Sequence, residues 1–105
     1  LRENMAHAGA LRIDHVMALS RLFWIPEGAT AAEGAYVGYP LDALLDVLAI
    51  ESVRARCLVV GEDLGTVPEG FRERLAAADV LSYRVLWFEQ DSARFQPPSP
   101  APGMS

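Results

Sequence analysis

A short apolar run meets two acids at residues 59–65, VVGEDLG. With Cys57 and Leu58 in front of it, the run is brief and rich in β-branched residues, which is typical of a strand buried on both faces in a parallel sheet. Acidic side chains belong in a core only when they are paired. Glu62 and Asp63 are therefore expected at the carboxyl end of this strand, where open α/β sheets and barrels place their chemistry.

The same arrangement occurs upstream at residues 10–15, ALRIDH, where another short apolar run ends in charge. Its acid, Asp14, precedes Glu62 by enough chain for one connection, one helix and a return to the sheet. Carboxylates at the ends of neighbouring parallel strands face the same cleft. Glycoside-bond chemistry uses such a pair, because one carboxylate attacks the anomeric carbon and the other protonates the leaving oxygen.

Composition favours one small globular unit. About half of the 105 residues are apolar (51%), which argues against a disordered chain. The net charge of −5 and the lack of a basic stripe give no reason to expect nucleic acid as a partner. The apolar runs are too short for a membrane span, and the first residues lack the pattern of a signal peptide. The single cysteine, Cys57, excludes an internal disulfide and is expected to pack in the core of a cytoplasmic protein.

Periodicity predicts strands that alternate with helices. The clearest helix covers residues 40–56, where leucines recur at helical spacing. A second helix is expected to run to about residue 78 from a capping box formed by Thr66 and Glu69. The other expected elements are a helix end at 1–8, strands at 10–15, 57–62 and 83–88, and a long loop at 16–39 with a turn or two of helix at 17–22.

This order predicts an α/β fold with about three parallel strands and intervening helices, because crossovers between parallel strands are right-handed. A complete (β/α)8 barrel needs about 250 residues, so the chain is expected to be a segment of one or a small open sheet. Residues 1–91 would form the barrel segment. Residues 92–105 are rich in proline and are expected to form a disordered tail or linker.

The motifs RIDH at residues 12–15 and GEDLG at residues 61–65 occur together at a separation that resembles the 4-α-glucanotransferases. These enzymes, also called amylomaltases or disproportionating enzymes, form glycoside hydrolase family 77. Three further stretches are similar to the same family: WIPEG at 24–28, GAYV at 34–37 and VLWFE at 85–89. The resemblance covers about residues 1–91 and implies a segment of a catalytic TIM barrel.

The resemblance also implies a retaining mechanism with a covalent glucosyl-enzyme intermediate. Asp14 matches the nucleophile of the family, and Glu62 matches its general acid/base. Arg12 lies two residues before Asp14, so both side chains share one face of the strand. A fixed cation at this position would favour the ionised form of the nucleophile.

Substrate contacts are implied for a further group of residues. His15 and Asp63 are expected to bind sugar hydroxyls or to orient their neighbours. Trp24 and Tyr36, in the long loop, are expected to stack on glucose and to exclude water in favour of a sugar acceptor. The implied partners are α-1,4-glucans and maltooligosaccharides, and no metal or cofactor is implied.

One departure concerns a third catalytic carboxylate. The family uses an aspartate after a histidine at the end of a later strand, whereas the histidines of this chain, His7 and His15, both lie early. We therefore expect the segment to be inactive in isolation.

Two other hypotheses are open at this point. Acids at successive strand ends also bind divalent metals in barrel lyases and racemases, and Asp14, Glu62, Asp63 and Glu89 allow that interpretation. Against it, the chain has no lysine to act as a base. Alternatively, the chain is a non-catalytic truncated fragment that self-associates through open strand edges.

Overall fold

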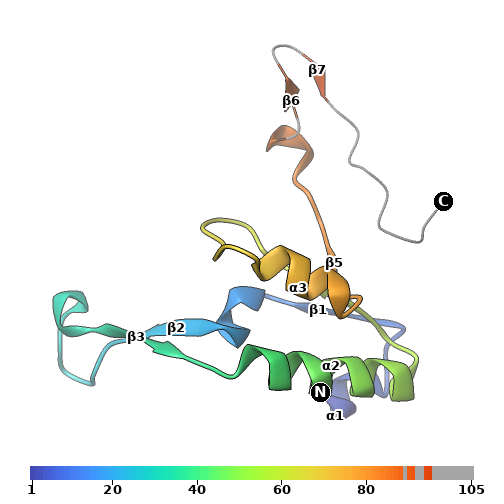
Figure 1. Cartoon of the computed structure of the whole chain (residues 1–105), viewed down its shortest axis with the longest axis horizontal. Coiled ribbons are helices and arrows are strands. Elements are labelled where there is room, and N and C mark those ends of the chain that lie inside the picture. Colours follow the sequence, from blue (N-terminus) through green and yellow to red (C-terminus); the bar gives the residue numbers. More distant parts are fainter. Residues whose placement is uncertain (89, 92–93, 96–105) are drawn as a thin grey trace.

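A three-stranded parallel sheet organises the fold (Figure 1). This computed structural model describes residues 1–88, 90–91 and 94–95. The strand order is β1-β4-β5, with bounds β1 Ala10–Ile13, β4 Leu58–Gly61 and β5 Leu81–Ser82. Since Ala10 pairs with Leu58 and Ile13 with Gly61, β1 and β4 end level with each other. The predicted α/β architecture with parallel strands is confirmed.

Burial differs between the two faces of this sheet. Leu11 and Val59 are register partners on the core face, and Val59 is 2% exposed. Leu58 belongs to the opposite face and is 58% exposed. The prediction that the strand is buried on both faces is therefore wrong. Alternate side chains of a strand point to opposite faces, and the described core cluster packs on one of them.

The helix α2 (Leu41–Ala55) confirms the helix predicted at residues 40–56. It ends at Arg56, which adopts the left-handed conformation (φ 51°) that often closes a helix. The short helix α1 (Arg2–Met5) is attached to α2 by Arg2, whose Nε lies 2.9 Å from both carboxylate oxygens of Glu51. The buried core joins both helices to the sheet and consists of Met5, Val16, Met17, Leu41, Leu45, Leu48, Cys57, Val59, Phe71, Leu75 and Val80.

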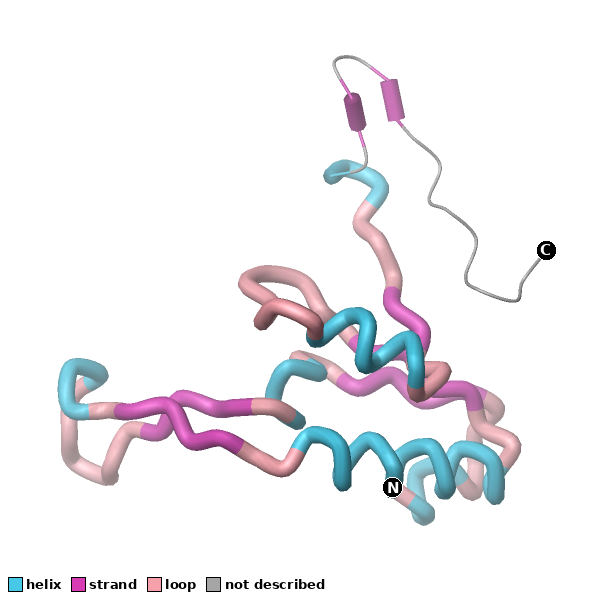
Figure 2. The backbone as a smooth tube through the Cα atoms, viewed as in Figure 1, coloured by secondary structure: helices cyan, strands magenta, loops and turns pink. Residues whose placement is uncertain are grey.

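Residues 16–39 are not the long loop that the sequence suggested. A 3-10 helix, η1 (Val16–Leu19), is followed by an antiparallel hairpin of β2 (Arg21–Trp24) and β3 (Ala35–Gly38), joined through η2 (Ala31–Glu33). The hairpin extends away from the helices (Figure 2). Aromatic and apolar side chains pair across it, which favours strands. The connection is longer than a tight hairpin turn and contains none of its signals, so sequence reasoning missed the pairing.

The predicted capping box is also wrong. The helix α3 covers Phe71–Ala77, and its N-cap is Gly70 without any side-chain cap hydrogen bond. Gly70 has a φ of 76°, which glycine adopts without steric cost and which interrupts helical geometry. The helix therefore begins after Gly70 and cannot extend back to Thr66.

The strand predicted at residues 83–88 lies elsewhere. β5 occupies Leu81–Ser82, and Ser82 pairs with Gly61, the last residue of β4. Because β4 ends there, the chain beyond Ser82 has no strand of this sheet to pair with. It forms a 3-10 turn instead, η3 (Leu86–Phe88), in which the Phe88 N–H donates to the Val85 carbonyl at 2.8 Å.

Beyond this turn, β6 (Gln90–Asp91) and β7 (Arg94–Phe95) pair antiparallel. The rest of the predicted tail at residues 92–105, and also Glu89, lie outside the described residues. No helix among those that the structure describes has the length and apolar content needed to cross a membrane.

Candidate active site

The ends of β1 and β4 place the two predicted catalytic acids at one edge of the sheet. Ile13 and Gly61 are register partners, and each is followed by an acid, Asp14 and Glu62. The Glu62 N–H donates to the Ile13 carbonyl at 2.8 Å, and the Glu62 carbonyl accepts from the Val16 N–H at 2.8 Å. Backbone pairing thus continues past the strand ends and carries both acids into the same region.

Backbone amides hold the Glu62 carboxylate. Its Oε2 accepts from the His15 N–H at 2.8 Å, and its Oε1 accepts from the Leu64 N–H at 2.8 Å. His15 adopts the left-handed conformation (φ 44°, ψ 60°), which is uncommon for a residue with a side chain. Because the His15 N–H belongs to the peptide that follows Asp14, the Glu62 carboxylate is anchored on the backbone of the other acid.

Arg12 connects Asp14 to the third strand. The Arg12 Nη2 donates to Asp14 Oδ1 at 2.7 Å and to the Tyr83 hydroxyl at 3.1 Å. Hydrogen bonds to Tyr83 and to Asp14 raise the pKa of Arg12 above its ordinary value. The Asp14 side chain is 76% exposed, so a substrate can reach it. We call Arg12, Asp14, His15 and Glu62 the sheet-edge site.

Asp63 occupies a different environment. Its side chain is 5% exposed, and its Oδ2 lies 2.7 Å from the Nε of Arg72 on α3. The Arg72 Nη2 also donates to the Asp63 carbonyl at 3.1 Å. Arg72 therefore fixes both the side chain and the backbone of the segment that carries the Leu64 N–H. The predicted contact between Asp63 and a sugar stays a prediction, since one carboxylate oxygen is already occupied.

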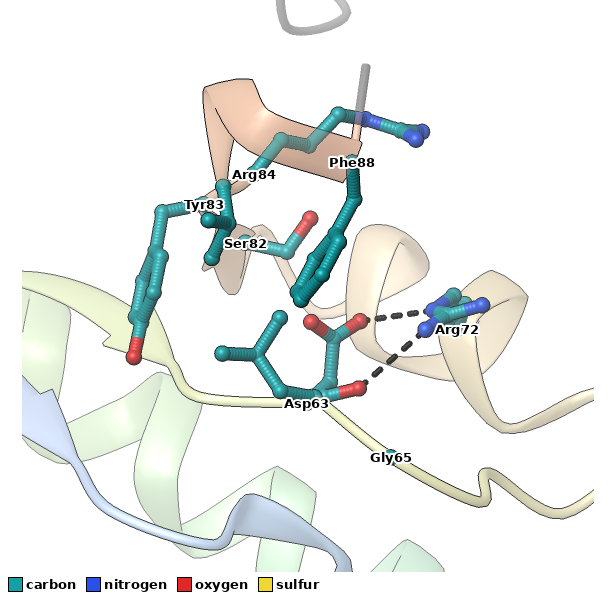
Figure 3. A pocket seen from close by; sticks show the side chains of 9 residues that line it. Asp63, Gly65, Arg72, Ser82, Tyr83, Arg84 and Phe88 are labelled. Carbon is teal, nitrogen blue, oxygen red and sulfur yellow. Dashed lines mark hydrogen bonds and ion pairs between the residues drawn. The ribbon is translucent and has the colours of Figure 1, made fainter. Parts of the chain in front are cut away.

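A pocket of about 250 Å³ opens beside Asp63 (Figure 3). In this view the ring of Phe88 lies over Asp63, and Tyr83 projects to the other side of the pocket. Tyr83 thus belongs both to the wall of the pocket and, through Arg12, to the sheet-edge site. The lining residues are Asp63, Leu64, Gly65, Arg72, Ser82, Tyr83, Arg84, Val85 and Phe88.

The two predicted stacking residues lie on the hairpin. Trp24 is 57% exposed and donates from Nε1 to the Tyr39 hydroxyl at 2.7 Å. Tyr36 is 64% exposed and packs edge-to-face with Phe23, with ring centroids 5.2 Å apart, and its ring centroid lies 4.6 Å from the Arg21 Cζ. Since Tyr36 pairs with Phe23, the neighbour of Trp24, the two predicted residues point to opposite hairpin faces. Their role as sugar platforms stays a prediction.

The sequence prediction omitted Tyr83 and Arg72. Tyr83 is the first residue of the strand predicted at 83–88, and the sequence does not distinguish the arginines of the helix predicted to run to about residue 78 from each other. No local sequence pattern singles out Tyr83, because the end of β5 at Ser82 is set by its pairing with Gly61. Within the described ranges, His, Cys, Asp and Glu side chains form no group of three or more that could hold a metal ion.

Comparison with known proteins identifies the family. The sequence model of Glyco_hydro_77, 4-alpha-glucanotransferase, matches residues 1–105. The chain is 59% identical over 92 residues to the 4-alpha-glucanotransferase of Haemophilus influenzae, and 48% identical over 91 residues to that of Mycobacterium tuberculosis strain H37Rv. These alignments cover 88% and 87% of this chain, but it spans only 13% of the length of either relative.

A solved structure agrees with this assignment. The chain is similar to the crystal structure of amylomaltase from Corynebacterium glutamicum, with a TM-score of 0.79 and 36% sequence identity. The alignment covers 91% of this chain and 14% of the amylomaltase chain. The family match extends over the whole sequence and includes both acid motifs. The chain therefore belongs to glycoside hydrolase family 77, the 4-alpha-glucanotransferases.

Proposed function

We propose that this chain supplies the nucleophile and the general acid/base of a retaining 4-α-glucanotransferase that acts on α-1,4-glucans and maltooligosaccharides. Asp14 is the nucleophile and Glu62 is the acid/base. The segment contributes neighbouring strands of a (β/α)8 barrel, whose carboxyl-terminal edge forms the active site. Family membership favours glucan transfer over the hypothesis of a metal-dependent lyase or racemase.

The observation that carries this proposal is the hydrogen bond from the His15 N–H to Glu62 Oε2. It joins two acids from different strands through one peptide group. A retaining enzyme needs its two carboxyl groups about 5–5.5 Å apart, because the nucleophile and the proton donor act on the same glycosidic bond. Because Glu62 is hydrogen-bonded to the peptide that follows Asp14, the two acids keep a constant position relative to each other.

The reaction follows from these roles. An Asp14 oxygen attacks the anomeric carbon of the donor, the bond from that carbon to the leaving oxygen breaks, and Glu62 protonates the leaving oxygen. In the second step, the 4-hydroxyl of an acceptor glucan gives its proton to Glu62 and its oxygen displaces Asp14 from the anomeric carbon. Both Glu62 oxygens accept backbone N–H hydrogen bonds in this structure, which orient the carboxyl group at the sheet edge.

The remaining site residues take supporting roles in this proposal. Arg12 holds the Asp14 side chain through their 2.7 Å contact. His15 and Asp63 contact sugar hydroxyls or orient the acids, and Trp24 and Tyr36 provide ring faces for glucose.

Covalent trapping tests the nucleophile. In a full-length 4-alpha-glucanotransferase that carries this segment, a fluorinated glucosyl donor should label Asp14, as detected by mass spectrometry of the digested protein. Asp14→Ala should abolish the label, because no oxygen remains to attack the anomeric carbon.

Asp42→Ala is the matched control, since the Asp42 side chain is also 76% exposed and also pairs with an arginine, Arg74. Its labelling should equal that of the wild type. Labelling that survives in Asp14→Ala would refute the assignment of the nucleophile.

A further inference from the structure

We propose that Tyr83 is a positioning residue that holds Arg12 against Asp14, an inference that rests on the proposed function. Tyr83 comes directly after β5, far along the chain from β1. Its hydroxyl accepts a hydrogen bond from the Arg12 Nη2 at 3.1 Å. Its ring centroid also lies 5.6 Å from the Arg12 Cζ, within the range of a cation–π contact. One tyrosine thus engages the guanidinium in two ways.

The need for such a partner follows from the exposure of the ion pair. The side chains of Arg12 and Asp14 are 53% and 76% exposed. An ion pair this open to water is weak, because solvent screens it and a long arginine side chain loses rotamer freedom when it is fixed. Tyr83 is only half-buried but adds a hydroxyl and a ring contact to the same guanidinium. Both additional contacts restrict the conformations that Arg12 samples.

The sheet register explains why Tyr83 can reach Arg12. Gly61 pairs with Ser82 on one side and with Ile13 on the other. The residue after Ser82 therefore leaves the sheet at the edge where β1 delivers Asp14. The contact spans all three strands, from the third to the first.

The consequence for catalysis concerns the direction in which Asp14 points. The Arg12 Nη2 engages Oδ1 of Asp14. A carboxylate has a second oxygen, and a guanidinium that stays fixed on the first one directs the second toward the anomeric carbon. Displacement of a reacting group by a fraction of an ångström lowers the rate of the chemical step while substrate binding is retained. A loss of Tyr83 should therefore lower kcat and leave KM nearly unchanged.

Two variants separate the contributions of the hydroxyl and the ring. In a full-length 4-alpha-glucanotransferase that carries this segment, Tyr83→Phe keeps the ring and should lower kcat on maltotriose by about five-fold. Tyr83→Leu removes both contacts and should lower kcat by about twenty-fold. KM should stay within about two-fold of the wild type in both variants. A raised KM with an unchanged kcat would overturn the proposal, because Tyr83 would then bind substrate directly.

A double-mutant cycle tests whether Tyr83 acts through Arg12. In the Arg12→Ala background, Tyr83→Phe should lower kcat by no more than about 1.5-fold, because its target is gone. If the two losses multiply instead, Tyr83 acts independently of Arg12 and the proposal fails.

Ser52→Ala controls for a general loss of stability, since Ser52 donates a hydroxyl hydrogen bond to the Cys57 carbonyl at 2.6 Å at the end of α2. It should lower the thermal unfolding midpoint and leave kcat unchanged. Covalent labelling of the wild type separates the two proposals. An unlabelled wild type refutes the proposed function together with this inference, whereas a labelled wild type with an unaltered kcat in Tyr83→Phe refutes this inference alone.

Discussion

The sheet-edge site and the β2–β3 hairpin both display side chains that we assign to glucan chemistry, but different interactions hold them. Contacts in the sheet-edge site join distant parts of the chain, such as Glu62 to the His15 N–H and Arg12 to Tyr83. Contacts of the hairpin are local, such as Phe23 with Tyr36 and Trp24 with Tyr39, the residue that follows β3.

This difference predicts separate roles for the two regions. The sheet-edge site rests on a parallel sheet whose core face is buried, so its geometry depends on the fold. The hairpin residues are nearly all exposed on both faces, so their positions depend on pairing within the hairpin. We therefore expect changes at the sheet edge to affect the chemical step, and changes in the hairpin to affect glucan binding.

The largest expected effect concerns the general acid. In a full-length 4-alpha-glucanotransferase that carries this segment, as for the variants below, Glu62→Gln should lower kcat on maltotriose by about 10³-fold, because the leaving oxygen is no longer protonated. Formation of the covalent intermediate from a glucosyl fluoride should fall much less, since fluoride leaves without a proton. Steady-state and single-turnover kinetics on the two donors measure the contrast.

The control for this variant is Glu69→Gln, which changes an exposed acid between β4 and α3 and should leave both rates unaltered. Glu62→Gln also turns an NH₂ group toward one of the two backbone N–H donors, from His15 or Leu64. Equal losses on both donors would therefore mean a displaced side chain or a wrong role, and would count against Glu62 as the acid.

A smaller effect is expected from the ion pair of Asp63 and Arg72, which lies next to the sheet-edge site. Arg72→Gln leaves the Asp63 carboxylate, whose side chain is 5% exposed, without its ionic partner. The midpoint of thermal unfolding should fall by about 3 °C, because a buried charge without a partner is costly. We also expect kcat to fall by about five-fold, since the backbone that presents the Leu64 N–H to Glu62 loses its anchor.

Arg74→Gln is the matched control on the same helix. Arg74 pairs with Asp42, but both side chains are largely exposed (47% and 76%), and such pairs contribute little to stability. Its midpoint and kcat should match those of the wild type. If both arginine variants lower the midpoint equally, the pairing of Arg72 with the buried Asp63 carboxylate has no special role.

The smallest effect on chemistry is expected from the hairpin. A Cβ at Gly34 would lie 2.7 Å from Phe23 ring atoms and from the Trp24 carbonyl oxygen, so Gly34→Ala should distort the hairpin. KM for maltotriose should rise by about five-fold, because the stacking residues shift. Covalent labelling of Asp14 by a saturating small donor should stay within about two-fold of the wild-type rate.

Gly38→Ala is the control within the same hairpin, since a Cβ at Gly38 meets no atom within 4 Å. Its KM should be unchanged. A strong loss of Asp14 labelling in Gly34→Ala would contradict the division between the two regions.

Sequence reasoning predicted the parts of the fold that depend on local periodicity. The helix at α2 and the strands at β1 and β4 have clear patterns, and the acids lie at the strand ends as predicted. The hairpin and the β5 region were missed for a physical reason. Apolar and aromatic residues at 22–24 and 85–88 suit several backbone conformations, and only the presence or absence of a pairing strand selects among them.

By itself, the sequence determined the α/β order, the family and the positions of Asp14 and Glu62 at the ends of their strands. Tertiary structure alone decided that the His15 N–H donates to Glu62, that Tyr83 contacts Arg12, and that Arg72 forms an ion pair with Asp63. The reason is strand register, because a shift of one residue turns every side chain of a strand to the opposite face. No local sequence pattern indicates which side chain a residue at a strand end will contact.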